Sequence, residues 1–319
     1  MTQATRWGLT VPLSELSLPD HRELVRRLPD LGYTDLWSAE ANGADAFTPL
    51  TLASQWAPEL RLGTAIAPVY TRGPGLLAMS AAALAECAPD RFVLGVGTSS
   101  QTIVEDWNAT PFTEPYARTR DTVRFLRAAL AGEKVTERYP TFAVRGFRLG
   151  RPPRTAPPLM VAALRPGMLR LAGREADGAI TNWLAASDVP AVRGELGSEA
   201  ELVARIFVCP TPDADTARAL ARRHIAGYLT VPVYRAFHEW LGRGERLAPM
   251  QEAWAAGDRK RALELIPDDV VDELVVHGEP AACREHIRAY VEAGVSTPVL
   301  MPLTTGGDPA ALVDALAPE

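Results

Sequence analysis

Short apolar runs alternate with amphipathic stretches along the whole chain. Apolar runs bounded by glycine, proline or charged residues are typical of strands that are buried on both faces of a parallel sheet. We predict eight such strands, at residues 7–11, 35–38, 60–67, 92–97, 159–163, 178–182, 200–209 and 297–301.

The stretches between these strands have a helical period and contain strong helix formers. We predict helices at residues 20–31, 48–56, 76–87, 115–130, 167–174, 213–227 and 280–294, and a β-like excursion at 142–149. The segment between the seventh and eighth strands is longer than the others. Because residues 231–272 of that segment are rich in helix formers and aromatic residues, we predict a helical insertion there.

Eight strands alternating with helices favour an α/β fold of the (β/α)8 TIM-barrel type, because this number of parallel strands closes a sheet on itself. Residues 1–319 are therefore predicted to form a single TIM-barrel domain with the insertion packed against it. An open doubly wound sheet also alternates strands and helices. The strand count and the lack of a GxGxxG motif after the first strand favour the barrel.

Composition and charge limit the possible classes of function. The 319 residues are 47% hydrophobic and 23% charged, as expected for a globular protein with a large core. The net charge is −6 and the basic residues are scattered, which gives nucleic-acid binding little support. The three cysteines are isolated, and neither a signal peptide nor an apolar run of membrane-spanning length is apparent. We therefore expect a cytoplasmic protein with a small-molecule substrate and no membrane partner.

The carboxyl ends of the strands are where TIM barrels place their chemistry, and the end of the fourth strand is polar. Gly95 and Gly97 are expected to let the backbone approach a ligand. Thr98, Ser99 and Ser100 supply hydroxyl groups suited to an anion or a polyol. The alternative interpretation is a turn that only caps the next helix.

The fifth and sixth strand ends carry further candidate groups. Arg165 and Gly167 stand at the start of a helix, where phosphate groups bind readily, although proline and glycine are also common punctuation there. Asn182 and Trp183 follow the sixth strand and are candidates for a ring-edge hydrogen bond and a stacking wall. The alternative for Trp183 is core packing.

Glu40 is the ionisable residue at the end of the second strand and the candidate for proton transfer. A carboxyl group in an apolar barrel mouth can donate or accept a proton. A salt bridge at the rim is the alternative. The sequence contains no HxH, HExxH, GxSxG or P-loop motif, so no metal site, α/β-hydrolase chemistry or P-loop is predicted.

Several segments carry a resemblance to a known family. The most telling are RFVLGVGTSS at 91–100, IVEDWN at 103–108 and RTR at 118–120, supported by GTAI at 63–66, YTR at 70–72, LRLAG at 169–173 and ADG at 176–178. Together these segments resemble the luciferase-like monooxygenase superfamily, and in particular its oxidoreductases dependent on coenzyme F420, a deazaflavin.

This resemblance implies a TIM barrel with an insertion near strand seven, usually a homodimer, and a non-prolyl cis peptide bond joining Ala65 to Ile66 behind the deazaflavin ring. It implies hydroxyl contacts to the ribityl chain or phosphate beside Gly97. The implied cofactor contacts are Ala65 and Ile66 for the ring, Thr98, Ser99 and Ser100 for the hydroxyls or phosphate, and Leu164, Arg165, Gly167, Met168 and Asn182 for the phospholactyl tail.

The resemblance implies hydride transfer between reduced F420 and an activated C=C or C=N bond of a small molecule or natural product, or oxidation of an alcohol. Glu40 and Trp183 are the candidate catalytic residues. Sugar-phosphate specificity is not expected, because Ala39 and Glu40 replace an Asp-His pair of the sugar-phosphate dehydrogenases, and Ser100 replaces a Glu. The alternatives are an FMN-dependent monooxygenase that uses oxygen, and a barrel that only binds the coenzyme.

Overall fold

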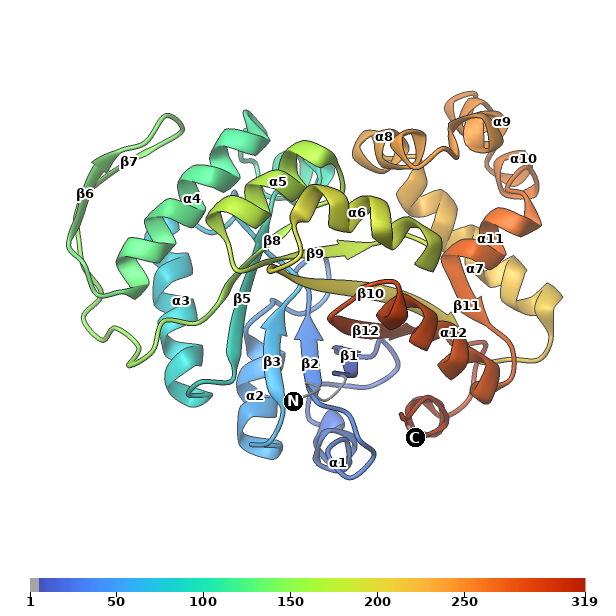
Figure 1. Cartoon of the computed structure of the whole chain (residues 1–319), viewed down its shortest axis with the longest axis horizontal. Coiled ribbons are helices and arrows are strands. Elements are labelled where there is room, and N and C mark those ends of the chain that lie inside the picture. The colour runs from blue at the N-terminus through green and yellow to red at the C-terminus, as the bar shows by residue number, and fades with distance from the viewer. Residues whose placement is uncertain (1–5, 319) are drawn as a thin grey trace.

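The computed structural model describes residues 6–318, and its centre is a closed barrel of parallel strands (Figure 1). Each barrel strand pairs with the next, and the last strand pairs with the first, which closes the sheet. The predicted α/β TIM barrel is thereby confirmed. Its eight strands are β1 (Gly8–Val11), β2 (Asp35–Ser38), β3 (Arg61–Thr64), β5 (Phe92–Gly97), β8 (Leu159–Ala162), β9 (Gly178–Asn182), β10 (Glu201–Cys209) and β12 (Thr297–Pro302).

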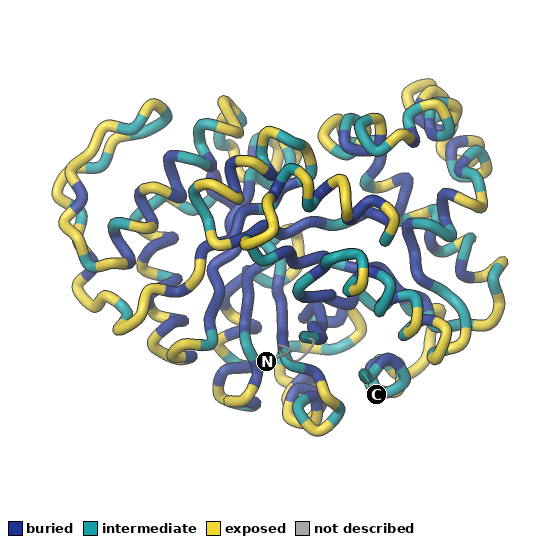
Figure 2. Tube along the Cα trace, viewed as in Figure 1, coloured by how far each residue is buried: buried dark blue, intermediate teal, exposed yellow. Residues whose placement is uncertain are grey.

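Helices surround the barrel, with the strands buried and the outer faces of the helices exposed (Figure 2). Leu, Ile, Val and Ala side chains on the outer face of the strands pack against the helices in one continuous core. The surrounding helices are α1 (His21–Arg27), α2 (Thr48–Trp56), α3 (Pro74–Cys87), α4 (Pro115–Leu130), α5 (Pro166–Glu175), α6 (Val189–Leu196), α7 (Ala214–Leu229), α12 (Pro280–Glu292) and α13 (Pro309–Ala315).

Further elements lie at the two ends of the long axis of the molecule (Figure 1). The β-like excursion is the antiparallel hairpin of β6 (Val135–Arg138) and β7 (Ala143–Phe147). The residues predicted as a helical insertion contain α8 (Pro232–Trp240), α9 (Gly244–Ala255) and α10 (Arg259–Glu264), and most of α11 (Asp268–Leu274). They pack with α7, and the short strand β11 (Val275–His277) then extends the sheet beside β10.

Two details differ from the predicted elements. The single strand predicted at 60–67 is divided into β3 and the short β4 (Ala67–Pro68), and the bond between Ala65 and Ile66 is the cis peptide that the family resemblance implies. The helices α6 and α13 were not predicted. Both are short, and α6 contains Pro190 and Gly194, residues that weaken a helical pattern in sequence.

The lower part of the barrel interior is closed by an ion network. Arg61 donates hydrogen bonds of 2.7 Å to both carboxylate oxygens of Glu201, and its guanidinium lies 3.5 Å from Asp35. Burial opposes ionisation of Glu201, but the hydrogen bond and charge of Arg61 outweigh it and lower the pKa of that carboxyl group. The network therefore connects β2, β3 and β10, and the charge of Arg61 is paired with the two carboxylates.

Above this network a layer of large side chains fills the barrel. Trp37 is fully buried there with Val93, Met160, Ile180, Val203 and Val299. The Trp37 ring lies directly over Gly63 on the neighbouring strand, and a Cβ added to Gly63 would lie 2.2 Å from ring atom Cε3. Only glycine fits at this position, because the indole has no free space into which it can move.

We predict that Gly63→Ala lowers the free energy of unfolding by about 1–3 kcal/mol, because the new methyl group overpacks the Trp37 layer. Urea unfolding of the full chain measures this change. The matched control is Gly43→Ala, since a Cβ at Gly43 meets nothing within 4 Å. Equal stabilities of the two variants would contradict the account of the Trp37 layer.

Candidate functional site at the barrel mouth

The interior of the barrel changes from filled to accessible above the Trp37 layer. Side chains alternate along a strand, so residues two positions beyond the buried layer also face inward. These residues are only half-buried, unlike the layer below them. We call this set, together with Ile66, the barrel mouth: Ala65, Ile66, Ala162, Asn182, Arg205 and Met301.

One side of the mouth is a wall of small apolar groups formed by Ala65 and Ile66. The Ala65 N–H donates to the Ser38 carbonyl at 2.5 Å, and the Glu40 N–H donates to the Ile66 carbonyl at 3.2 Å. Both contacts tie the wall to the end of β2. Because backbone groups make these contacts, the side chains of Ala65 and Ile66 are left to face the mouth.

The two glycines at the end of β5 serve the packing of the barrel. A Cβ at Gly95 would lie 2.0 Å from the Thr64 carbonyl oxygen, and one at Gly97 would lie 2.7 Å from the Ala162 Cβ. Close packing of neighbouring strands is therefore one reason for these glycines, and room for a ligand stays a prediction. They are required because neighbouring strands approach too closely for a side chain.

The hydroxyl-rich segment after β5 is half-buried and partly used within the chain. The Thr98 hydroxyl donates to the Ser99 carbonyl at 3.2 Å. The Ser100 hydroxyl accepts a hydrogen bond from the Ile103 N–H at the start of a π-helix, η1 (Thr102–Trp107). The capping alternative thus describes Ser100. Cofactor contacts of Gly97, Thr98, Ser99 and Ser100 stay predictions.

The predicted phosphate seat lies at the start of α5, directly after β8. Arg165 is the residue before the first turn, and both Arg165 and Gly167 are exposed. The first N–H groups of a helix have no partner within the helix and carry partial positive charge. Leu164 and Met168 pack partly on the core beside them. Pro166 has no N–H and the Met168 N–H donates to the Arg165 carbonyl at 3.0 Å, so the segment offers an anion the Gly167 N–H and the Arg165 guanidinium.

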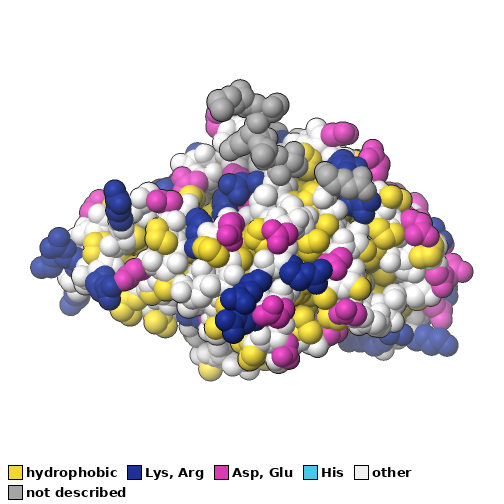
Figure 3. Space-filling model, turned by 90° about the horizontal axis from the view of Figure 1, so that it is seen from below, with side chains coloured by type: hydrophobic (Ala, Val, Ile, Leu, Met, Phe, Trp, Pro, Cys, Tyr) yellow, Lys and Arg dark blue, Asp and Glu magenta, His cyan; other side chains and the backbone are white. Residues whose placement is uncertain are grey.

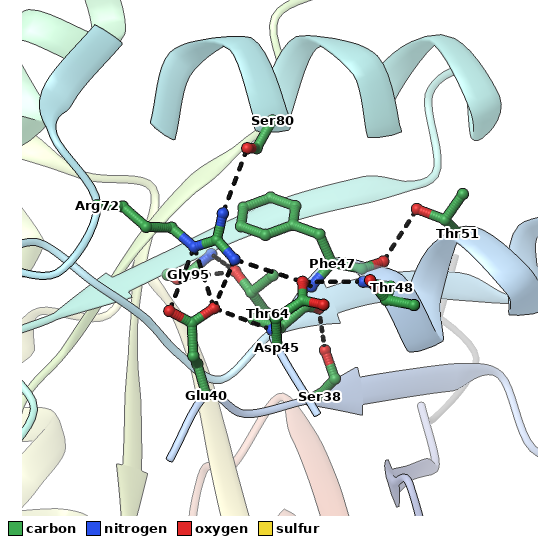
Figure 4. A network of polar contacts seen from close by, with 11 residues as sticks. Ser38, Glu40, Asp45, Phe47, Thr48, Thr51, Thr64, Arg72, Ser80 and Gly95 are labelled. Carbon is green, nitrogen blue, oxygen red and sulfur yellow. Dashed lines mark hydrogen bonds and ion pairs between the residues drawn. The ribbon is translucent and has the colours of Figure 1, made fainter. Parts of the chain in front are cut away.

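Glu40 makes an ion pair with Arg72, which lies in the loop between β4 and α3 (Figure 4). The Arg72 guanidinium donates three hydrogen bonds of 2.8–3.2 Å to Glu40, and the Ala46 N–H donates a fourth at 3.1 Å. Asp45 lies 3.4 Å from the same guanidinium, and the Phe47 ring lies beneath it. The apolar surroundings predicted for Glu40 are therefore wrong, and the rim salt bridge is the correct alternative.

Trp183 points away from solvent and packs against other aromatic rings. It is 1% exposed, and its ring stacks on Phe207 with centroids 3.9 Å apart. Its φ of 55° lies in the left-handed region, which is uncommon for a bulky residue and turns the chain at the end of β9. Core packing, the alternative interpretation, describes this side chain. A part in catalysis stays a prediction.

Sequence reasoning missed the most exceptional residue of the mouth, Arg205. It is the only charged residue of the upper part of β10, where it stands in an otherwise apolar run. Its Nη2 contacts the Met301 sulfur at 2.9 Å, and its Nε is buried without a hydrogen-bond partner. A lone charge at an inward-facing position of a strand was the signal that could have identified it.

The rest of the described chain adds two negative findings. Within residues 6–318, no three His, Cys, Asp or Glu side chains gather in a way that could hold a metal ion. None of the helices in that range is long and apolar enough to cross a membrane. On the face seen in Figure 3, basic and acidic side chains are interspersed, in line with the scattered charges of the sequence.

Comparison with known proteins places these features in a wider context. The family model for luciferase-like monooxygenases matches residues 3–297. The chain is 28% identical to a Mycobacterium tuberculosis protein named among the coenzyme F420-dependent oxidoreductases, over 94% of this chain and 93% of that protein.

Two solved structures share the fold. One is an F420-dependent secondary alcohol dehydrogenase in complex with an F420–acetone adduct (TM-score 0.78, 18% identity, 98% and 97% of the two chains covered). The other is the oxygenating constituent of 3,6-diketocamphane monooxygenase from Pseudomonas putida in complex with FMN (TM-score 0.70, 15% identity, 99% and 96% covered).

We predict that Arg72→Met lowers the free energy of unfolding by about 1–3 kcal/mol, because two half-buried carboxylates lose a charged hydrogen-bond donor. The control is Arg124→Met, whose ion pair with Glu175 is more exposed at 52% of the arginine side chain, so we expect a loss below about 1 kcal/mol. Urea unfolding at neutral pH compares the two. A larger loss in Arg124→Met would refute the structural importance of the Arg72 cluster.

Proposed function

The chain belongs to the luciferase-like monooxygenase family, and on this premise we propose that it is a coenzyme F420-dependent oxidoreductase. Its substrate is an activated C=C or C=N bond of a small molecule or natural product, which receives a hydride from the reduced coenzyme. The name of its Mycobacterium tuberculosis relative supports the choice of coenzyme. The observation that carries the proposal is a barrel mouth with an apolar wall on one side and unpartnered polar atoms inside.

The residues of the mouth fit a flat ring with a polar edge. Ala65 and Ile66 offer a small apolar surface on which a ring face can lie. Deeper in the barrel, the Thr10 hydroxyl and the Trp37 indole N–H are buried and have no hydrogen-bond partner among residues 6–318. In the mouth itself, Arg205 Nε is also buried without a partner in that range. Unpartnered buried polar atoms are costly, so a ligand with polar atoms at its edge is favoured in the mouth. A purely apolar ligand would not satisfy them.

The remaining cofactor contacts are proposed at the carboxyl ends of β5, β8 and β9. Thr98, Ser99 and Ser100 would bind hydroxyl or phosphate groups beside Gly97. The first turn of α5 and the exposed Arg165 would bind the negatively charged tail. The other proposed tail contacts are Leu164, Gly167, Met168 and Asn182.

When bound, F420 supplies a hydride carrier that reacts poorly with oxygen. Hydrogen bonds within the protein hold the residues around the proposed coenzyme site in place. The Glu40 N–H fixes the Ile66 carbonyl behind the wall, and Arg72 fixes the Glu40 carboxylate. We propose Glu40 for proton transfer at this edge of the mouth. We propose that Trp183 supports the mouth indirectly. Its ring stacks on Phe207, and the Phe207 ring lies 5.3 Å from the Arg205 guanidinium.

An FMN-dependent monooxygenase is the second candidate function. It is favoured by the likeness in fold to the monooxygenase constituent in complex with FMN. Flavin and deazaflavin rings have the same flat shape and a similar polar edge. The wall and the unpartnered atoms therefore fit both, and a direct binding measurement must distinguish them.

We predict that the purified protein binds F420 with micromolar affinity and binds FMN at least about tenfold more weakly, followed by cofactor fluorescence. Arg165→Gln should weaken F420 binding by about tenfold, because one charged hydrogen bond to the tail is lost. Arg151→Gln, which removes an exposed arginine paired with Glu86, is the charge-matched control. A preference for FMN would reverse the order of the two candidates and make oxygen uptake the next assay.

We predict that Glu40→Gln reduces turnover of reduced F420 by about 10²–10⁴-fold and leaves F420 affinity nearly unchanged, if Glu40 transfers the proton. Asp45→Asn is the matched control, because Asp45 also faces Arg72. It accepts hydrogen bonds from the Phe47 and Thr48 N–H groups, whereas the backbone of Glu40 is bonded to the wall. Thermal unfolding of both variants separates a chemical from a structural effect. Unchanged turnover in Glu40→Gln would remove Glu40 from the mechanism.

A further inference from the structure

Arg205 is a cation inside the barrel without a counter-ion. It follows the buried Val203 by two positions on β10, and the paired residue Asn182 lies beside it on β9. Among residues 6–318, no carboxylate lies within 4.0 Å of its guanidinium, whereas the other inward-facing arginine, Arg61, is paired with Glu201 and Asp35. Removing a charge from water without pairing it is unfavourable for folding.

The neighbours of Arg205 leave its positive charge without a counter-ion. Met301 and Phe207 contact it with a sulfur atom and an aromatic ring, neither of which neutralises its charge. His224 on α7 lies close enough that burial and the charge of Arg205 lower the pKa of the imidazole, which favours its neutral form. The corner therefore has one fixed positive charge and no negative one among the described side chains.

A second donor reaches this corner from α8. The Tyr234 hydroxyl donates to the Asn182 side-chain oxygen at 3.1 Å, and the Tyr234 ring packs edge-on against Tyr228. Burial raises the pKa of Tyr234, so the phenol keeps its proton at neutral pH. Tyr234 thus places a neutral phenol next to the guanidinium, and its O–H would turn from Asn182 to a carboxylate bound there.

The position of Arg205 in the sheet separates it from the proposed cofactor wall. Around the closed barrel, β10 is four strands away from β3 in either direction. Arg205 therefore faces the wall of Ala65 and Ile66 across the full width of the mouth. A ring lying on the wall turns its other face toward Arg205, which is the side from which a substrate must approach.

We propose that Arg205 and Tyr234 form the seat for a carboxylate group of the substrate. A guanidinium binds a carboxylate with two parallel hydrogen bonds, a geometry that no neutral group reproduces. The proposal rests on the proposed function for the identity of the ligand on the opposite wall. It names the substrate class as unsaturated or imine compounds that carry a carboxylate.

The test compares carboxylates with their amides, which have similar shape but no charge. Acetate, benzoate and cinnamate are each paired with acetamide, benzamide and cinnamamide, and binding to the full chain is measured by calorimetry with and without oxidised F420. In the wild type, at least one carboxylate should bind about tenfold more tightly than its amide, because one charged contact is gained. Arg205→Gln should abolish this difference, and Tyr234→Phe should reduce it.

The control variants separate recognition from folding. Arg235→Gln removes an exposed positive charge from the same helix as Tyr234 and should keep the preference for carboxylates. Arg205→Lys keeps a charge but not the two-pronged geometry, and should retain only part of the preference. Because Arg205 lacks a counter-ion, Arg205→Gln should unfold at the wild-type temperature or above it, whereas a structural arginine would unfold lower.

Each outcome decides between explanations. If no carboxylate is preferred by the wild type, with or without F420, the proposal is wrong. It is also wrong if Arg205→Gln weakens F420 binding and leaves carboxylate binding unchanged, since the charge would then serve the cofactor. A carboxylate preference in a protein that does not bind F420 would uphold the seat and reject the proposed coenzyme.

Discussion

The packing of Trp37 over Gly63 determines how deep the barrel is open. The indole spans the interior and rests on a backbone without a side chain, which closes the barrel above the Arg61–Glu201 ion network. Apart from Ile66, the residues of the barrel mouth lie two positions further along the chain than the floor position of the same strand. The depth of the mouth, and so the space for a ligand, follows from the contact between a tryptophan and a glycine.

Two arginines near the mouth illustrate how pairing distinguishes structural charge from available charge. Arg72 has its hydrogen bonds taken up by Glu40 and Asp45, and it holds the loop between β2 and α2 in place. Arg205 contacts the Met301 sulfur and the Phe207 ring, and no carboxylate within residues 6–318 pairs with it. A charge satisfied within the protein contributes to stability, whereas an unsatisfied one retains its capacity to bind.

The sequence predicted the barrel well because its strands are fully buried. The apolar runs at 35–38, 92–97 and 178–182 coincide with β2, β5 and β9, since both faces of these strands meet apolar neighbours. The surroundings of Glu40 could not be predicted from the sequence, because Arg72 lies 32 residues further along the chain and is brought near only by folding. The tight packing at Gly95 and Gly97 likewise depends on which strands become neighbours.

The helices that follow β10 have an apolar core of their own. It runs through α7, α9, α10 and α11 and reaches the barrel through Trp183 and Phe207. Tyr234, on α8, belongs to this separate cluster, whereas Ala65 and Ile66 belong to the barrel. Evolution can therefore reshape one contiguous stretch of gene to select a new substrate, while the half of the site proposed for the coenzyme, encoded elsewhere in the chain, continues unaltered.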